Sequence, residues 1–540
     1  MKFESEPDIQ KWLDQFGSSL GTEDASRQFA RWQALQGVGR KLEETLSQYP
    51  DLSFSEAQAL LDRASQILRY DEEYWVVIIG ETGAGKSTLL NALLQDRLLL
   101  TGGGAAITGT AVYVYPDSDT DHDKAEIFIR EQNEFKPLLL DLASRYFEAE
   151  KRLEVFGAED ALTATTVIQL VSDNKIVQQL DDTISDKDKQ EIQEEFHDIA
   201  QIWNRIENIN KEIKKEFLLP EDRELLNSYL IEGEGINERE KDTRVIPAIK
   251  YAKYYLMKNS SSYLSGKSSS NVVFVDVPGS AAKTLRHTEN LPQEVKNANA
   301  VILVVNPNRP AEKEGTSIAN LLEKDLFEGY TAEEKKKFSN RVFIVVNKAD
   351  QIKSEDDKSR LDKSLSHLCE IIGDKDLLNS RCLGISAEKS ILALMRRKNI
   401  EMESDMEKNY YATLAKCPVE ELGNVNADQL DRESGVPVFV EKLSHFLSKE
   451  RVKSMLDEGE VLLDKTSNSA RLYCGGILGL DGSEISSKRL EEIGVKEKGF
   501  CDQTLEQDRR ELDDSRKKLI SLVQEWIDSG EHQERVSLKI

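Results

Sequence analysis

A short run of residue types suited to holding phosphate lies between positions 80 and 88. Gly80, Gly83 and Gly85 allow the backbone to curl closely enough for several N–H groups to converge on a polyphosphate. Lys86 is suited to reach the β- and γ-phosphates, and the Ser87 hydroxyl is suited to ligate Mg²⁺. The expected nucleotide-binding residues here are Gly80, Glu81, Thr82, Gly83, Ala84, Gly85, Lys86, Ser87 and Thr88.

The residues on either side of this run predict a strand before it and a helix after it. Residues 76–79 are an apolar run too short for a core helix, whereas a helical pattern begins at Leu89. A strand, a glycine loop and a helix in this order aim the positive end of the helix dipole at a bound phosphate. The eight-position pattern in this context favours a phosphate-binding loop over a chance glycine turn.

Two further stretches carry residues suited to a metal ion and a terminal phosphate. Thr108 and Thr110 lie where a glycine-rich loop enters a β-branched strand, and we expect one of them to reach Mg²⁺. Asp276 ends an apolar strand, where an open parallel sheet places its ligands, and the Gly279 N–H is suited to sense the γ-phosphate. The candidate metal ligands are Ser87, Thr108, Thr110 and Asp276, and the candidate catalytic positions are Lys86, Thr82, Thr108, Thr110 and Gly279.

The polar residues that follow two later strands are suited to a guanine base. The Asp350 carboxylate can accept from both N1–H and the exocyclic amine of guanine, whereas adenine presents an acceptor at N1. A site built for this pairing rejects adenine because the wrong base leaves its charge unpaired. Lys348 can lay its stem over the ring, and Ser386 or Ala387 can offer a backbone N–H to guanine O6. The expected base-side residues are Asn347, Lys348, Asp350, Ser386 and Ala387.

The elements that would position these residues predict an α/β fold, with a mostly parallel, doubly wound sheet and a phosphate loop. At 540 residues the chain is too long for one compact core. We expect a nucleotide domain at residues 71–450, with a large helical insertion at residues 132–250. Helical segments at residues 1–70 and 451–540 are expected to pack on one another as a flanking bundle, because both carry apolar stripes that need cover.

Three local patterns make further structural predictions. Residues 110–115 and 125–130 read as strands on either side of a polar turn, so we expect them to pair as a hairpin. Apolar residues recur every three or four positions from 192 to 217, which predicts one helix ended by Pro220. Residues 248–257 are expected to return to strand.

Composition and net charge limit the classes of partner and the cellular compartment that fit this chain. The chain has 72 basic and 98 acidic residues, a net charge of −26, so bulk charge disfavours non-specific binding to nucleic acid or anionic lipid. Its five cysteines are scattered, without the spacing of a disulfide framework or a metal site. Without an apolar run long enough for a signal peptide or a membrane span, the sequence predicts a soluble, intracellular protein.

In their order, the five motifs resemble those of the translation-factor-related GTPases, and within that class the dynamin superfamily. These five motifs are residues 80–87, Thr108/Thr110, Asp276-Val-Pro-Gly279, Asn347-Lys-Ala-Asp350 and Ser386-Ala387. Residues 109–112 and 305–309 carry the narrower resemblance as well. Among dynamin-like proteins the chain is most similar to the nuclear GTPases typified by SLIP-GC, which include fungal relatives. The resemblance implies GTP or GDP with Mg²⁺, hydrolysis of GTP to GDP and phosphate, and nucleotide-driven movement of a helical bundle.

The motifs depart from the family where transition-state charge is usually compensated. Dynamin itself carries glutamine and serine at the positions of Thr82 and Gly83, and guanylate-binding proteins carry an arginine at that of Gly83. Ser280 stands where Ras-like proteins place a catalytic glutamine. The compensating charge is expected from Arg286, from Arg309, or from a second molecule in a homodimer across the nucleotide face.

Two other functions stay open from the sequence. A scaffold that binds GTP but hydrolyses it negligibly fits the missing glutamine and arginine. A membrane-remodelling GTPase fits much of the superfamily, although the acidic charge and the lack of a recognisable lipid-binding segment count against it. Localisation in the nucleus, as opposed to the cytoplasm, follows from the resemblance alone.

Overall fold

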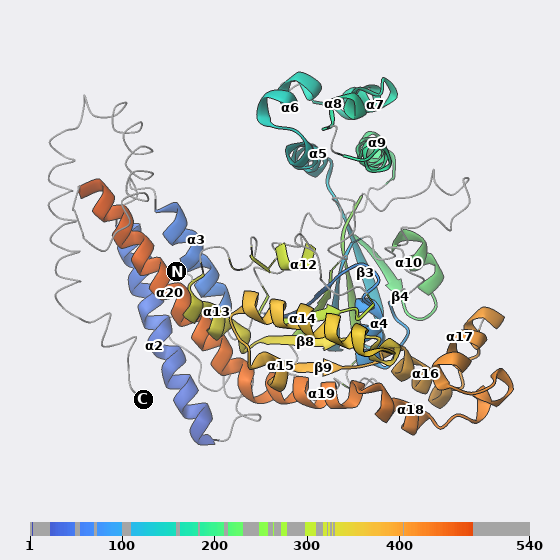
Figure 1. Ribbon diagram of the computed structural model, residues 1–540. Helices are drawn as coiled ribbons and strands as arrows, with labels where there is room; N and C mark the ends of the chain where they lie inside the picture. Colours follow the sequence, from blue (N-terminus) through green and yellow to red (C-terminus); the bar gives the residue numbers. More distant parts are fainter. Residues whose placement is uncertain are drawn as a thin grey trace. The chain divides into compact units, whose positions relative to one another are not determined.

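The computed structural model divides the chain into two compact units, which we call the helical unit (residues 1–72 and 448–540) and the sheet unit (residues 73–447). The described residues are 3, 22–48, 54–69, 73–99, 110–157, 162–181, 184–209, 214–230, 248–257, 263, 272–277, 298–308, 317–320, 322–323, 327, 330–402 and 404–478. Figure 1 labels their α-helices and, among the strands, β3, β4, β8 and β9. No described helix has both the length and the apolarity needed to cross a bilayer.

One nine-stranded sheet organises the described part of the sheet unit, in the order β4-β3-β5-β2-β6-β1-β7-β8-β9. The strands are β1 (Tyr74–Gly80), β2 (Ala111–Ser118), β3 (Lys124–Ile129), β4 (Lys214–Leu218), β5 (Ile249–Met257), β6 (Val272–Asp276), β7 (Ala300–Val305), β8 (Val342–Val346) and β9 (Cys382–Gly384). From β6 through β1, β7 and β8 to β9 all neighbours run parallel. This arrangement confirms the predicted α/β class, with a mostly parallel sheet at its centre.

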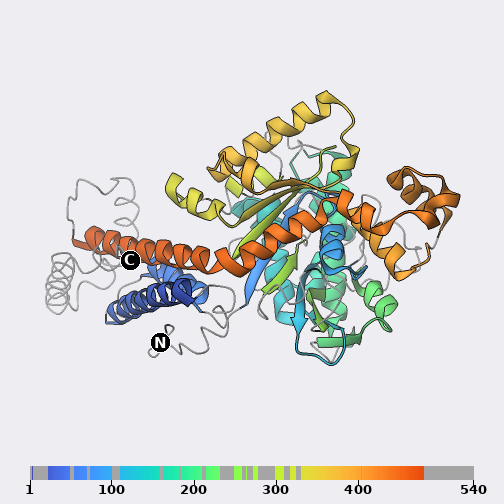
Figure 2. The same ribbon diagram turned by 90° about the horizontal axis from the view of Figure 1, so that it is seen from below.

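Helices cover both faces of the parallel strands. The helices around these strands are α4 (Lys86–Leu94), α12 (Ser317–Asn320), α13 (Ala332–Ser339), α14 (Glu355–Ile372), α15 (Leu377–Ser380), α16 (Ala387–Lys398), α17 (Asp405–Ala415), α18 (Ala427–Ser434) and α19 (Val436–His445), with the short 3₁₀ helices η6 (Ala349–Gln351) and η7 (Val419–Asn424) and the π-helix η8 (Phe446–Glu450). Val76 and Ile78 pack in one core with α4, α16 and α19. Val77 packs in a second core with α14, which Figure 2 shows in yellow beside the strands. Since successive strand residues face opposite ways, β1 is buried on both sides.

The expected hairpin between the second and third strands is wrong, because β5 lies between them. β5 pairs parallel with β2 and antiparallel with β3. The polar turn after β2 is held by β5 and by the residue that follows β4. The Asp123 carboxylate accepts from Met257 N at 2.8 Å, and the Asp123 carbonyl accepts from Leu219 N at 3.0 Å. The prediction of a strand at residues 248–257 is confirmed by β5. This strand occupies the position beside β2 that the expected hairpin assigned to β3.

A group of helices follows β3 in the sequence. It comprises α5 (Gln132–Tyr146), α6 (Ala149–Phe156), α7 (Ala164–Ser172), α8 (Lys175–Gln179), α9 (Asp186–Ile209) and α10 (Arg223–Leu230), of which α5 to α9 gather together in Figure 1. The expectation of one helix across residues 192–217 is wrong, since α9 ends at Ile209 and β4 begins at Lys214. Phe196 on α9 and Phe217 on β4 are both buried in the same core, so the apolar spacing continues through a change of structure.

The described helical unit is built from α2 (Thr22–Ser47), α3 (Ser55–Ile67) and α20 (Arg451–Leu478), which share one apolar core. Trp32 on α2 is fully buried, and its indole N–H donates to the Leu68 carbonyl at 2.6 Å. Ion pairs join the helices around this core: Arg31 lies 2.7 Å from Asp457, and Arg63 lies 3.1 Å from Glu458. The N-terminal helices therefore pack against a helix from the C-terminal part of the chain.

Candidate functional site

The loop between β1 and α4 has the close backbone contacts that its glycines predict. Gly85 has φ +86°, and an added Cβ would lie 2.3 Å from the Asn347 amide nitrogen. An added Cβ on Gly80 would lie 2.6 Å from the Val304 carbonyl oxygen on the neighbouring strand. Both positions therefore require glycine, one for conformation and one for space. We call residues 80–88 together with Asp276 the phosphate side of the site.

Lys86, at the start of α4, is buried within this loop. Its ammonium donates to the Gly80 carbonyl at 3.2 Å and to the Glu81 carbonyl at 3.4 Å. Burial lowers the pKa of Lys86, and the charges of Asp276 and Glu81 oppose this shift. The loop thus holds a cation among backbone groups at a helix N-terminus, which is an arrangement suited to phosphate.

Ser87, in the first turn of α4, lies beside Asp276, the last residue of β6. The Ser87 hydroxyl donates to Asp276 Oδ2 at 2.6 Å, and Asp276 is completely buried. The other carboxylate oxygen, Oδ1, finds no hydrogen-bond partner among the described residues. Burial raises the pKa of Asp276, whereas Lys86 and the Ser87 hydrogen bond act in the opposite direction. A hydroxyl beside a carboxylate oxygen with spare acceptor capacity fits the hard-oxygen preference of Mg²⁺.

Asn347 connects this loop to the later strands. Its amide nitrogen donates to the carbonyls of Ala84 at 3.0 Å and Gly85 at 3.3 Å. Its amide oxygen accepts from the backbone N–H of Lys348 at 2.9 Å and of Ala387 at 3.0 Å. The side chain is 1% exposed, so four hydrogen bonds are satisfied inside the protein. Asn347 therefore acts as a clamp between three segments that are far apart in the sequence.

The predicted base-side residues lie around this clamp, and we call residues 347–350 and 386–388 the base side. Lys348 has φ +61°, and its ammonium donates to the Gly83 carbonyl at 2.8 Å. Asp350 is exposed, whereas Ser386 and Ala387 are buried. The Ser386 N–H donates to the Ser434 carbonyl at 2.7 Å, so in this structure both predicted O6 donors, Ser386 and Ala387, are engaged within the protein.

The remaining predicted residues differ in what the structure says of them. Thr110 is buried, and its hydroxyl donates to the Lys250 carbonyl on β5 at 2.9 Å. Thr82 lies in the loop, and its hydroxyl has no hydrogen-bond partner among the described residues. Thr108 and Gly279 lie outside the described residues, as do Ser280, Arg286 and Arg309.

Sequence reasoning missed Glu388 and the two tyrosines of α17 beside the base side. The Tyr411 hydroxyl donates to Glu388 Oε2 at 3.4 Å, and the rings of Tyr410 and Tyr411 lie 5.3 Å apart. Burial raises the pKa of Glu388, while Lys348 opposes this and the charge of Asp350 adds to it. Glu388 directly follows the predicted Ser386-Ala387 pair, but nothing in the sequence indicates that α17 packs here.

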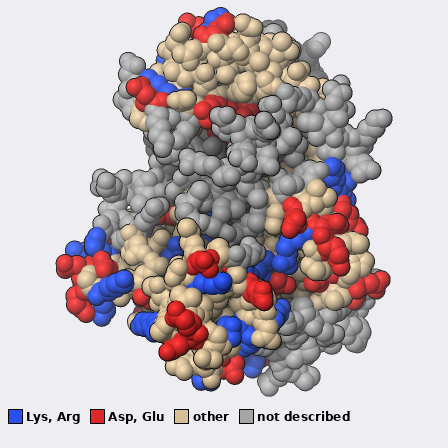
Figure 3. All heavy atoms as spheres, turned by 90° about the vertical axis from the view of Figure 1, so that its right-hand side faces the viewer, with Lys and Arg blue, Asp and Glu red and all other residues tan. Residues whose placement is uncertain are grey.

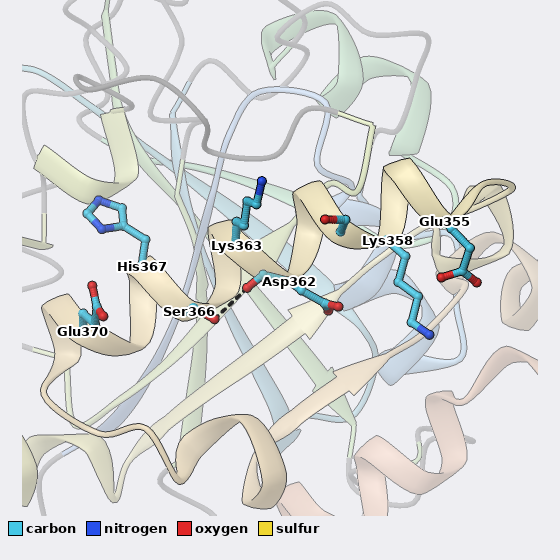
Figure 4. Close-up of a pocket in the computed structure, with 8 residues that line it drawn as sticks. Glu355, Lys358, Asp362, Lys363, Ser366, His367 and Glu370 are labelled. Atoms are coloured by element: carbon cyan, nitrogen blue, oxygen red, sulfur yellow. Dashed lines mark hydrogen bonds between the residues drawn. The ribbon is translucent and has the colours of Figure 1, made fainter.

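A hollow along the outer face of α14 carries no comparable arrangement. Charges of both signs alternate along it, including Glu355, Lys358, Asp362 and Lys363 (Figure 4). The Ser366 hydroxyl donates to the Asp362 carbonyl at 2.8 Å, as side chains on a solvated helix often do. Among the described residues, no group of three or more His, Cys, Asp or Glu side chains forms a metal-ligand set.

The comparison with solved structures returns matches described as an oligomerised bacterial dynamin pair that provides a mechanism for the long-range sensing and tethering of membranes. One is 16% identical with a TM-score of 0.38, covering 91% of this chain and 53% of the other. A second is 16% identical with a TM-score of 0.37, covering 98% of this chain and 66% of the other. The chain thus spans about half to two thirds of their lengths.

The comparison with protein families matches the part of the chain that carries most of the motifs. No protein of curated function matches the sequence significantly. The model of the dynamin family matches residues 76–349, which is just over half of the chain and runs from β1 to the residues that follow β8. The match includes the glycine loop, Asp276 and Asn347. The chain therefore belongs to the dynamin family.

Proposed function

We propose that the protein binds GTP and Mg²⁺ in the site between the phosphate side and the base side, and hydrolyses GTP to GDP and phosphate. Members of the dynamin family bind GTP and GDP, generally with Mg²⁺. The observation that carries the proposal is the 2.6 Å contact between Ser87 and Asp276, with Lys86 buried in the same loop. Three groups that phosphoryl transfer requires thus converge from two segments almost 190 residues apart.

On the phosphate side, the chain supplies the positive charge and the metal ligands. Lys86 exchanges its two carbonyl acceptors for phosphate oxygens, which are stronger acceptors because they are charged. Ser87 and Asp276 hold Mg²⁺, with Thr108 or Thr110 as a further ligand. When bound, Mg²⁺ neutralises phosphate charge. Gly279 and Thr82 remain the proposed groups beside the γ-phosphate.

On the base side, exposed and buried groups have different tasks. The exposed Asp350 carboxylate is open to the N1–H and amine of guanine, and the Lys348 stem covers the ring. We assign the O6 contact to Ser386 or Ala387 at the N-terminal end of α16, whose backbone N–H would exchange its present acceptor, the Ser434 carbonyl or the Asn347 amide oxygen, for guanine O6. Asn347 holds these groups at a fixed separation from the phosphate loop.

Hydrolysis also needs a charge that offsets the one developing on the γ-phosphate. We propose that Arg286, Arg309 or the nucleotide face of a second copy supplies this charge. We further propose that GTP promotes a homodimer through this face, together with movement of the helical unit. Within the dynamin family, we propose on the basis of its motifs that the chain is related to the SLIP-GC-like nuclear GTPases. We propose a nuclear or cytoplasmic location, with the nucleus resting on this resemblance alone.

The experiment that tests the nucleotide function compares the full chain with Lys86→Ala. We expect wild type to bind GTP with Mg²⁺ in a calorimetric titration and to release phosphate, and Lys86→Ala to do neither. A matched control is Lys358→Ala on the outer face of α14, which should leave both properties unchanged. Tight GTP binding by Lys86→Ala would refute the assignment, whereas binding without phosphate release by wild type would identify a GTP-binding scaffold.

The homodimer needs its own measurement. Light scattering should give a monomer with GDP and a dimer with a non-hydrolysable GTP analogue or a transition-state mimic. A monomer in all three states, with phosphate release independent of protein concentration, would contradict the role of a second copy. If Arg286→Ala and Arg309→Ala then released phosphate as fast as wild type, the remaining proposed sources of charge would be excluded.

A further inference from the structure

Helix α17 is fastened beside the base side at two points. The Tyr411 hydroxyl reaches Glu388, one residue after Ala387, at 3.4 Å, and Tyr411 is itself 5% exposed. Glu407, one turn earlier on α17, lies 3.3 Å from Arg97, which follows the end of α4. The first attachment point belongs to the base side, and the second follows α4, whose N-terminal end carries Lys86 and Ser87. Contacts from these two segments therefore position α17.

Tyr410 lies next to these contacts on α17, and its side chain stays partly exposed to solvent. Its ring packs edge-on against Tyr411, with centroids 5.3 Å apart and an interplanar angle of 64°, yet Tyr410 remains 44% exposed. Burial, together with the charges of Glu388 and Asp350, raises the pKa of its phenol. A large aromatic side chain thus lies beside Tyr411, which reaches the base side through Glu388, while much of its own surface lacks cover. Figure 3 views the side of the molecule that carries α17, where described charges of both signs are interspersed.

We propose that Tyr410 forms the outer wall of the nucleoside pocket and packs its ring against the guanine base held by Asp350 and Lys348. This inference rests on the proposed function and adds a residue to its base side. Asp350 cannot cover the apolar face of the purine ring, since a carboxylate pairs only with the edge of the base. A ring from α17 removes that face from water, and it does so equally for GDP and GTP.

The test measures Mg²⁺-dependent binding of GDP, GTP and inorganic tripolyphosphate to the full chain. For Tyr410→Ala we expect both nucleotides to bind about tenfold more weakly, as for the loss of one base–aromatic contact, with the ratio between them unchanged. Tripolyphosphate has no base, so its binding should not change. Tyr410→Phe keeps the ring and should bind like wild type.

A matched control lies on the same helix. Met406 is 83% exposed on α17, and Met406→Ala should leave nucleotide binding unchanged if the effect belongs to the Tyr410 ring. Nucleotide affinities of Tyr410→Ala equal to those of wild type would overturn the assignment of Tyr410 but leave the nucleotide function intact. An equal loss of tripolyphosphate binding, or of thermal stability, would also overturn it, because α17 would then act through the fold. If wild type bound neither nucleotide, the proposed function itself would fail.

Discussion

The phosphate side and the base side of the candidate site are built in opposite ways. On the phosphate side the functional groups belong to the protein interior: Lys86 is 8% exposed and Asp276 is fully buried. On the base side Asp350 is exposed. Substitutions on the phosphate side should therefore affect folding and binding together, whereas those on the base side should change recognition alone. Asn347, Ser386 and Ala387 are exceptions on the base side, since they are buried as well.

The largest effect is expected from Gly85→Ala on the phosphate side. Alanine is strained at φ +86°, and its Cβ would collide with the Asn347 amide. We expect the free energy of unfolding to fall by at least about 2 kcal/mol and GTP binding to become undetectable. Chemical denaturation and calorimetry measure the two quantities.

Gly157→Ala is the control for Gly85→Ala. Gly157 also has a positive φ, +74°, but an added Cβ would meet nothing within 4 Å. Its φ and ψ, +74° and −167°, are adopted readily by glycine alone, so alanine should cost about 1–3 kcal/mol of stability from backbone strain and leave GTP binding intact. An equal loss of GTP binding in the two variants would contradict the close contact between the loop and Asn347.

The next largest effect is expected from Asp350→Asn on the base side. An amide can donate to the O2 oxygen of xanthine, where guanine carries an amine, so the preference should invert. We expect GTP to bind about a hundredfold more weakly and xanthosine triphosphate to bind more tightly, with an unchanged melting temperature. Competition binding with the two nucleotides checks the inversion. A marked loss of stability would place Asp350 with the structural residues and break the contrast between the two sides.

A smaller effect is expected from Asn347→Asp at the clamp. The carboxylate still accepts from Lys348 N and Ala387 N, but it cannot donate to the carbonyls of the loop. We expect about 2 kcal/mol of destabilisation and about tenfold weaker binding of both GDP and GTP. Thermal unfolding with and without GDP measures both effects. Loss of one property without the other would show that Asn347 does not couple the two sides.

The smallest effect is expected from Lys348→Met, which keeps the apolar stem and removes the ammonium. The hydrogen bond to the Gly83 carbonyl is lost, but the side chain is only partly buried. Nucleotide affinity should fall about threefold, as for one partly exposed hydrogen bond, without a change in base preference. A loss as large as that of Lys86→Ala would mean that the two lysines share one task.

The sequence predicted those features that depend on short, local patterns. The glycine loop after β1, the strand that ends at Asp276 and the strand before Asn347 are each readable from a few neighbouring residues, and the α/β class followed from their order. Strand pairing was not readable, because β5 inserts between β2 and β3 from more than a hundred residues away. The apolar spacing through Phe217 also fits a strand as well as a helix.

The same distinction holds within the candidate site. The side-chain chemistry of Lys86, Ser87 and Asp350 is enough to suggest a task for each, and those tasks stay predictions. The clamp formed by Asn347, which bonds to the loop and to Ala387 together, required the folded arrangement. So did the approach of α17 to Glu388, since tertiary contacts between distant helices leave no mark in local spacing.

The central claim is that the two sides form one guanine-nucleotide site. Its most direct test is calorimetric titration of the full chain with GTP and with ATP, both in the presence of Mg²⁺. We predict that GTP binds at least about a hundredfold more tightly than ATP, because Asp350 rejects adenine while both triphosphates meet the same phosphate loop. Equal affinities for GTP and ATP would contradict the claim.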